Sequence, residues 1–363
     1  MEPMTADEAA HGVALRGAAQ TSSAGCAARL PDGTWVVEVG GAANTFFDLA
    51  SVTKPMTAVA LARLAAAGTL PFEAPLGHHV VEARGTPSEH VALELFLAHR
   101  AGLAAHRTLF APLLAGQPVD RAAALREAAT ARRDDAPGVA PVEGFAPLYS
   151  DLGYALAGEA LARAAGTRDA GEAIGRLVVA PLGLARVLGT ARELGGFDAG
   201  REVAPTELAD WRGGVVRGAV HDENAWALDG TGGSGHAGIF GTVRAVLDFG
   251  TAVLDALDRR PGAVLGDADV ARLVRERPGG TLRAGFDGKS AEGSSAGERM
   301  GARAFGHLGF TGTSLWIDPD AAVVVVLLTN RVHPTRENVA IRAERPRVHD
   351  ALYERAVLLR SRG

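Results

Sequence analysis

The stretch Ser51-Val52-Thr53-Lys54 begins a predicted helix and holds one of only two lysines in a chain of 363 residues, the other being Lys289. An arginine keeps its proton in water, whereas a desolvated lysine can act as a base. Residues three apart on a helix share a face, with Cβ atoms about 5–6 Å apart, so the Ser51 hydroxyl lies within reach of the Lys54 amine. The spacing predicts a nucleophile and its base. A Ser N-cap followed by a surface lysine is the alternative interpretation.

The residues after Lys54 predict a buried amphipathic helix. Apolar side chains recur at helical spacing at Met56, Val59, Ala60 and Leu64, and Gly68 is a stop signal. Ser51 would then stand at the N-terminus of this helix, where free N–H groups and the helix dipole favour developing negative charge.

Composition limits the classes of function. At 363 residues the chain is long enough for two structural units, and 47% of its residues are hydrophobic. Its formal net charge of −5 gives no sign of binding nucleic acid or an anionic membrane. No apolar run is long enough to span a membrane, and residues 1–29 lack the pattern of a signal peptide. We therefore expect a cytoplasmic protein, or a periplasmic or secreted one if an export signal lies upstream. The single cysteine, Cys26, excludes an internal disulfide and is expected to be a small buried hydrophobe.

Two predicted hairpins stand at opposite ends of the chain. Residues 22–29 and 34–39 form strand-like runs around a Pro-Asp-Gly turn, and residues 313–317 and 321–328 flank Asp-Pro-Asp. The valine-rich second strand of the later hairpin suits a strand covered on both faces. A terminal helix is predicted over 336–360, kinked or restarted near Pro346.

Between the hairpins, alanine-rich segments predict helices over 121–133, 152–165 and 173–179. If the hairpins share one sheet, the fold is α/β (α+β), an antiparallel sheet flanked by helices with an inserted all-helical domain. The predicted division places 1–75 and 235–363 in the sheet domain and 76–234 in the helical domain. The active site is expected in the cleft between them.

Tyr149-Ser150-Asp151 directly precedes one of these helices. A phenol beside an ammonium group can have its pKa lowered enough to carry protons, so Tyr149 is a candidate proton relay. The alternative is a helix-initiating turn with Asp151 as the N-cap.

Phe305-Gly306-His307-Leu308-Gly309-Phe310 shows alternating glycines, which on a strand edge let a ligand approach the backbone closely. His307 is either a polar group facing the cleft or a hydrogen-bonded core histidine.

The three segments, in this order, resemble the motifs of the class C β-lactamase and penicillin-binding-protein group of serine hydrolases. Ser51–Lys54 resembles the Ser-x-x-Lys motif, Tyr149–Asp151 the Tyr-x-Asn motif and His307–Gly309 the Lys/His-Thr-Gly motif. Ancillary segments of the group, His-Thr-Ser-Gly-Leu and a Gly-rich run, resemble His99–Leu103 and Gly235–Phe240. Together with His221-Asp222-Glu223-Asn224, the Gly-rich run points to esterase-like and carboxypeptidase-like members.

The resemblance implies a β-lactamase/transpeptidase-like fold and an acyl-enzyme formed on Ser51, with Lys54 and Tyr149 moving the proton. It implies an oxyanion hole made by the N–H groups of Ser51 and Phe310, and substrate contacts from Asp151, His307 and Gly309. Neither a metal nor a cofactor is implied. The implied partner is a small ester, amide or peptide substrate, and the oligomeric state stays open.

Three departures from the group's pattern bear on the substrate. Asp151 replaces Asn, which should favour protonated Lys54 unless Asp151 is itself buried as a neutral acid. Leu308 replaces Thr and His307 replaces Lys, and both changes weaken recognition of an anionic β-lactam. We therefore expect an esterase or a D-Ala carboxypeptidase-like hydrolase. The alternatives are a true class C-type β-lactamase and, in another class, a non-hydrolytic penicillin-binding sensor or inert scaffold.

A catalytic metal is the other alternative. It would use several of the histidines together with the acidic residues near His221, but no pair has the spacing of a zinc helix such as H-E-x-x-H. We expect the His221-Asp222-Glu223 segment to be a hydrogen-bonded loop beside the cleft. The remaining candidate ligands are His78, His79, His90, His99 and His106.

Overall fold

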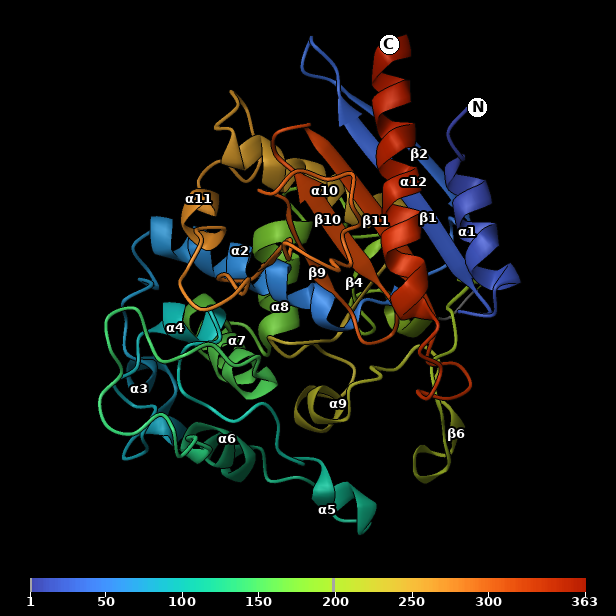
Figure 1. Ribbon diagram of the computed structural model, residues 1–363. Helices are drawn as coiled ribbons and strands as arrows, with labels where there is room; N and C mark the ends of the chain where they lie inside the picture. Colours follow the sequence, from blue (N-terminus) through green and yellow to red (C-terminus); the bar gives the residue numbers. More distant parts are fainter. Residues whose placement is uncertain (1, 198–199) are drawn as a thin grey trace.

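A six-stranded antiparallel sheet with strand order β2-β1-β11-β10-β9-β8 is the frame of this computed structural model, which describes residues 2–197 and 200–363 (Figure 1). Pairing of β1 with β11 joins the two predicted hairpins in one sheet, as expected. The strands are β1 Ser22–Arg29, β2 Trp35–Gly41, β8 Asp287–Gly288, β9 Phe305–Leu308, β10 Ser314–Asp318 and β11 Val323–Thr329.

Both faces of β11 are covered, as its unbroken valine run predicts. Val323, Val325 and Leu327 belong to a core cluster formed with α1 (Ala6–Leu15) and α12 (Ile341–Arg362). The alternate residues, Val324 and Val326 among them, belong to a second core cluster that includes α10 (Val243–Leu257). Successive side chains point to opposite faces of a strand, so one strand serves two apolar layers. Cys26 is fully buried in the first cluster.

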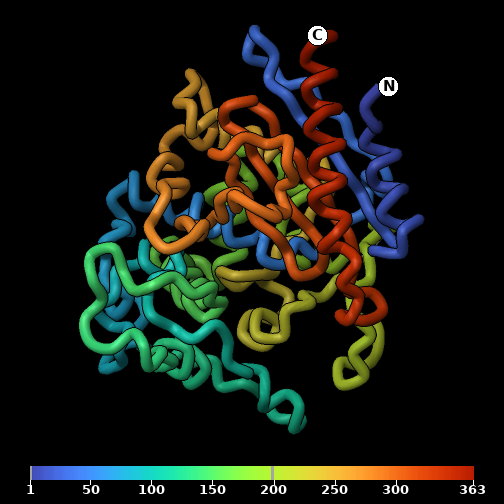
Figure 2. The backbone as a smooth tube through the Cα atoms, in the orientation of Figure 1, coloured from blue at the N-terminus to red at the C-terminus, as the bar shows by residue number. Residues whose placement is uncertain are grey.

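The C-terminal helix begins at Ile341, later than predicted, and runs through Pro346 without interruption. Residues 336–340 instead form an irregular segment in which Arg336 bonds to Glu207. The N- and C-termini lie at the same end of the molecule, where Arg355 of α12 pairs with Glu38 of β2 at 2.8 Å (Figure 2).

The middle of the chain is mainly helical. The predicted helices appear as α6 (Arg121–Thr130), α7 (Asp151–Ala165) and α8 (Ala170–Ile174), with a π-helical turn over Gly175–Val179. The other helices are α2 Thr53–Ala66, α3 Leu76–His79, α4 Leu93–Leu97, α5 Ala111–Leu114, α9 Glu223–Asp229 and α11 Val270–Leu273. Short strands form a second sheet, β3 Phe47–Asp48, β7 Ile239–Gly241 and β4 Leu188–Thr190, and a hairpin, β5 Leu208–Ala209 and β6 Gly214–Val215. Within the described residues, no helix combines the length and apolarity needed to cross a bilayer.

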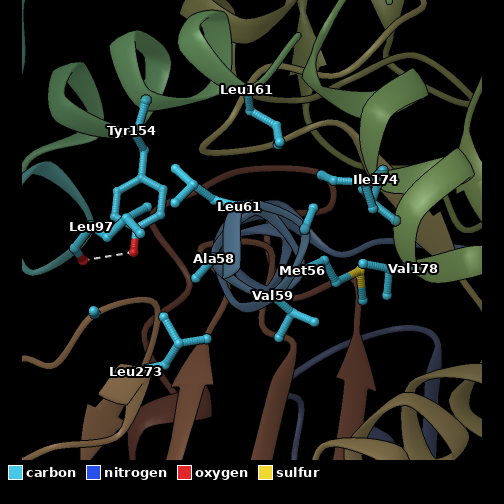
Figure 3. Close-up of a cluster of buried hydrophobic side chains, with 14 of the residues drawn as sticks. Met56, Ala58, Val59, Leu61, Leu97, Tyr154, Leu161, Ile174, Val178 and Leu273 are labelled. Carbon is cyan, nitrogen blue, oxygen red and sulfur yellow. Dashed lines mark hydrogen bonds between the residues drawn. The ribbon is translucent and has the colours of Figure 1, made fainter. Parts of the chain in front are cut away.

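Helix α2 runs through the core with neighbours on all sides (Figure 3). Met56 and Leu61 lie among side chains of α7, α8 and the following turn, and the Tyr154 hydroxyl donates to the Leu97 carbonyl at 2.7 Å. The helix is therefore less amphipathic than predicted, because Lys54 and Thr57 are as buried as its apolar residues. A helix packed in this way holds its first turn at a fixed place.

Candidate active site

Ser51 lies in a short 3₁₀ turn, Ala50–Val52, directly before α2. Ala50 has a positive φ of 47°, a conformation that side chains other than glycine rarely adopt. Buried Asp48 holds this turn, because its Oδ1 accepts the Ala50 N–H at 2.8 Å and its Oδ2 accepts the His221 N–H at 2.7 Å. Burial raises the pKa of Asp48. This role of Asp48 was not predicted from the sequence.

The Lys54 ammonium is surrounded by oxygen atoms and has no exposed surface. Its Nζ lies 2.7 Å from Ser51 Oγ, 2.7 Å from Asp151 Oδ1 and 3.3 Å from the carbonyl oxygen of His236. Burial lowers the pKa of Lys54, but Asp151 and Tyr149 more than offset it, so this pKa lies above its usual value. The surface-lysine interpretation is therefore wrong. The expected effect of Asp151 on the lysine is present in the geometry.

Ser150, and not Asp151, is the N-cap of α7. Its hydroxyl accepts the Gly153 N–H at 3.3 Å and donates to the Ala104 carbonyl at 2.6 Å. The cap interpretation of Asp151 is wrong because Asp151 is the first helical residue and its carboxylate turns toward Lys54.

The Tyr149 ring stands between two histidines and close to the lysine. Its centroid is 4.8 Å from Lys54 Nζ, 4.5 Å from the His99 ring and 6.0 Å from the His307 ring. Burial raises the pKa of Tyr149 and Lys54 offsets this only in part, so the expected net lowering is wrong. Burial also holds the pKa of His99 well below its usual value, which leaves Nδ1 free to accept the Ser150 N–H at 3.0 Å.

His307 is buried on β9 and does not line the cleft. Burial lowers its pKa to about 3, so the imidazole is neutral and its Nδ1–H donates to the Leu308 carbonyl at 2.8 Å. Of the two interpretations, the structure supports a histidine packed behind Tyr149.

The turn after β9 is tied to the strand that leads to Ser51. Thr311 Oγ1 donates to the Asp48 carbonyl at 2.7 Å and Thr313 Oγ1 to the Leu49 carbonyl at 2.9 Å. Gly309 is required at this junction, because a Cβ there would overlap Thr313 Oγ1 and lie 2.6 Å from the Leu49 oxygen. The turn brings Phe310 into the cleft that Ser51 lines.

A cleft of about 520 Å³ opens over Ser51. Tyr149, Asp151, Gly309 and Phe310 line it, whereas Lys54 and His307 lie beneath its surface. Its volume falls in the range of about 300–1,000 Å³ that small-molecule sites occupy. The lining comes from three parts of the chain: the segment before α2, the helical middle with α9, and the region from β9 to α12.

Buried His236 and partly exposed Asp222 form a pair next to the lysine. Their side chains meet at 2.9 Å between Nε2 and Oδ1, and Asp222 also lines the cleft. Burial lowers the pKa of His236 but Asp222 raises it overall, while His236 brings the pKa of Asp222 below its usual value. Both residues lie in segments that resemble the family's, but their contact was not predicted from the sequence.

Four arginines line the cleft beside Leu308, and none of them was predicted from the sequence. Arg336 pairs with Glu207 and Glu223. No acidic partner within 4.0 Å is found in the described part of the chain for the other three, Arg331, Arg342 and Arg345. Burial lowers the pKa of Arg345 to about 10, which still leaves it charged at neutral pH. This wall of the cleft is therefore suited to an anionic group.

The segment from His221 to Glu223 is held by side-chain bonds beside the cleft, as expected. His221 Nε2 lies 3.0 Å from Glu207 Oε2, and Glu223 pairs with Arg336. Over residues 2–197 and 200–363, no group of three or more His, Cys, Asp or Glu side chains is arranged to hold a metal ion.

Solved structures with the same fold include a hydrolase with promiscuous acyltransferase activity, EstCE1, and a class C β-lactamase from Rhodobacter sphaeroides. EstCE1 is 20% identical with a TM-score of 0.67, and the match covers 95% of this chain and 96% of that one. The β-lactamase is 16% identical with a TM-score of 0.66, and the match covers 96% and 98%. These likenesses confirm the predicted fold class.

A provisionally named D-alanyl-D-alanine carboxypeptidase of Salmonella agona is 32% identical over 146 residues, which are 36% of this chain and 34% of the relative. The match thus spans about a third of the relative's length. The β-lactamase family model matches residues 7–348, nearly the whole chain, which confirms the family that the sequence motifs indicated. The chain therefore belongs to the β-lactamase family of serine hydrolases.

Proposed function

We propose that the protein cleaves an ester or amide bond through an acyl-enzyme on Ser51. The observation that carries this proposal is the 2.7 Å contact between Lys54 Nζ and Ser51 Oγ beneath a cleft of ligand size. A nucleophile within hydrogen-bond reach of its base, with the base oriented by a third group, is the arrangement that activates a serine. Here Asp151 is the third group.

The proton follows the short contacts of the site. Ser51 Oγ attacks the carbonyl carbon while its proton passes to neutral Lys54, and the proton then moves, with Tyr149 as relay, to the departing alkoxide or amine. Water reverses these steps, because it attacks the acyl carbon and returns Ser51 as the leaving group. The pKa values of Lys54 and Tyr149 both lie above their usual values, so the protein at rest holds an ammonium and a phenol. The active fraction, with neutral Lys54, grows as the pH rises.

The negative oxygen of the tetrahedral intermediate would lie between the N–H groups of Ser51 and Phe310. Two observations support this role. The Thr311 and Thr313 hydroxyls hold the Phe310 turn against the strand before Ser51. In addition, the Phe310 N–H has no hydrogen-bond partner among the described residues.

For the substrate we propose an ester or a small D-amino-acid amide, with a β-lactam as the second candidate. Leu308 in place of a hydroxyl residue favours the first class. The arginine wall formed by Arg331, Arg342 and Arg345 favours an anionic substrate. Both the carboxylate of a peptide and that of a β-lactam meet this condition. The Salmonella relative's name agrees with the peptide.

Labelling with a fluorophosphonate tests the proposal. The wild-type protein should take up one equivalent, and Ser51→Ala should take up none. A separate sample of unlabelled protein is incubated with a p-nitrophenyl ester or fluorescent penicillin, and the acyl group on Ser51 is monitored by intact mass over time. A hydrolase loses this acyl group, whereas a sensor keeps it. Equal labelling of Ser51→Ala would overturn the assignment.

A further inference from the structure

The Phe310 side chain is a large apolar group left open to solvent inside the cleft. It is 50% exposed and lines the same cavity as Ser51. Exposed apolar surface within a ligand-sized cleft is unfavourable in water until a ligand covers it. The backbone of Phe310 has a proposed role at the oxyanion, but its ring has none so far.

The Phe310 ring is also held in place. It stacks on the His221 ring at 5.8 Å with an interplanar angle of 18°, and the Arg331 guanidinium lies 4.4 Å from its centroid. Glu207 fixes His221 through a 3.0 Å contact, and Arg331 Nε donates to the Phe310 carbonyl at 2.7 Å. An aromatic ring that is already fixed loses little conformational freedom when a ligand binds to it.

A second aromatic side chain, Phe110, reaches the cleft from the segment before α5. It stacks on Trp211 at 5.6 Å with an interplanar angle of 18°, and Trp211 meets Trp226 edge-on at 5.9 Å. Asn224 of α9 anchors the segment by donating to the Arg107 carbonyl at 2.8 Å. Phe110 is therefore a supported part of the cleft wall.

We propose that Phe310 and Phe110 form an apolar subsite for a bulky or aromatic substituent next to the scissile carbonyl. The inference rests on the proposed function, since it specifies the substrate class of the same site. The Phe310 N–H would contact the carbonyl oxygen, and the ring of the same residue lines the cleft that the rest of the substrate would enter. The substituent belongs either to the acyl group or to the leaving group.

Two substrate series distinguish the acyl side from the leaving-group side. The acyl series is p-nitrophenyl acetate, hexanoate and phenylacetate, and the leaving-group series is methyl acetate against benzyl acetate. We expect the wild-type kcat/KM to rise with apolar bulk in at least one series. In Phe310→Ala and Phe110→Ala, the kcat/KM for the bulky substrate divided by the kcat/KM for the small one should fall about tenfold. This is the size of effect expected from losing one apolar contact.

The ratio is internally controlled, since a poorly folded fraction lowers both rates together. Phe310→Leu, which keeps apolar bulk, should retain a ratio between those of wild type and Phe310→Ala. Leu15→Ala, which removes an exposed leucine from α1, is the matched surface control and should keep the wild-type ratio. If Ser51 is labelled but the ratio is unchanged in both phenylalanine variants, the subsite is refuted and the proposed function stands. If Ser51 is not labelled at all, the proposed function fails and the subsite fails with it.

Discussion

Lys54 and Lys289 show how one residue type takes two roles according to its neighbours. Lys289 Nζ donates to the Met300 carbonyl at 2.5 Å and the Glu298 carbonyl at 3.2 Å, so it fixes a loop. Lys54 Nζ instead contacts a hydroxyl and a carboxylate beneath the cleft. Lysine is scarce in this chain, so both positions stand out in the sequence. Only the contacts of the two side chains distinguish their roles.

Replacing each lysine tests this difference. Lys54→Ala should slow fluorophosphonate labelling of Ser51 at least about 100-fold, the low end for a general base. Lys289→Ala is the matched control and should label at close to the wild-type rate, with a loss of thermal stability only. Equal labelling rates in the two variants would contradict the role of Lys54 as the base.

Asp151 sets the protonation of Lys54 in a way that a pH profile can measure. Its carboxylate lies 2.7 Å from Nζ and stabilises the ammonium form, so it raises the pH at which free amine appears. Asp151→Asn removes this opposite charge, so it should move the acidic limb of the kcat/KM profile to lower pH.

The measurement is kcat/KM against pH for one activated ester in both proteins. Ser150→Ala is a useful companion, because it removes the cap of α7 without removing the charge beside the lysine. It should lower stability and leave the limb in place. A limb that moves to higher pH in Asp151→Asn would be incompatible with the ion pair as described.

At the scale of elements, the site depends on the contact between the turn after β9 and the strand before α2. The turn holds Phe310 and the strand leads to Ser51, so a small displacement of one against the other separates the two proposed oxyanion donors. Gly309 lies at the contact, where no side chain fits.

Gly309→Ala should therefore lower kcat/KM about 100-fold or more, which is the loss measured when one oxyanion donor is removed from other hydrolases. Gly153→Ala is the matched control, because a Cβ there would meet its nearest neighbour, the Phe96 carbonyl oxygen, at an ordinary 3.5 Å. Activity and circular dichroism of both variants check the prediction. Wild-type activity in Gly309→Ala would show that activity does not depend on the exact position of the turn after β9.

The strands and the start of α2 could be predicted because their signals are local. Alternating or continuous apolar runs define β1 and β11, and the spacing of Ser51 and Lys54 follows from one helical turn. The role of Asp48 could not be predicted, because its partners are distant in sequence: His221 is 173 residues away and Thr311 is 263. The arginine wall was missed for a different reason. Arginine is common throughout this chain, so arginines at 331, 342 and 345 do not stand out in the sequence.

At the scale of the whole molecule, the same sheet serves two cores, and α12 closes the one that it forms with α1. His349 of α12 is fully buried there and links three distant parts of the chain. Its Nδ1–H donates to the Ser295 carbonyl at 2.6 Å, and its Nε2 accepts the Ser314 hydroxyl of β10 at 2.8 Å. The neutral imidazole makes both bonds as described. In a protonated ring Nε2–H would instead donate to Ser314 Oγ, and the buried ring would carry a charge.

This arrangement predicts an acid-sensitive fold. Burial lowers the pKa of His349 to about 4, below the value of about 6.5 in an unfolded chain, so protonation favours the unfolded state. The contribution to stability is fully present above pH 6.5 and is lost as the pH falls toward 4. Between pH 7.5 and 5 the loss amounts to about 2 kcal/mol for this one group.

Urea unfolding at pH 7.5 and pH 5 measures the effect. His349→Gln keeps a polar side chain without the titration, so its free energy of unfolding should fall by about 2 kcal/mol less than that of the wild type over this interval. Burial also lowers the pKa of His307, to about 3, so the free energy of unfolding of His349→Gln should still depend partly on pH. His78→Gln, at an exposed histidine, controls for loss of an imidazole elsewhere. If the free energy of unfolding falls as much in His349→Gln as in the wild type between pH 7.5 and pH 5, protonation of His349 does not cause the loss of stability.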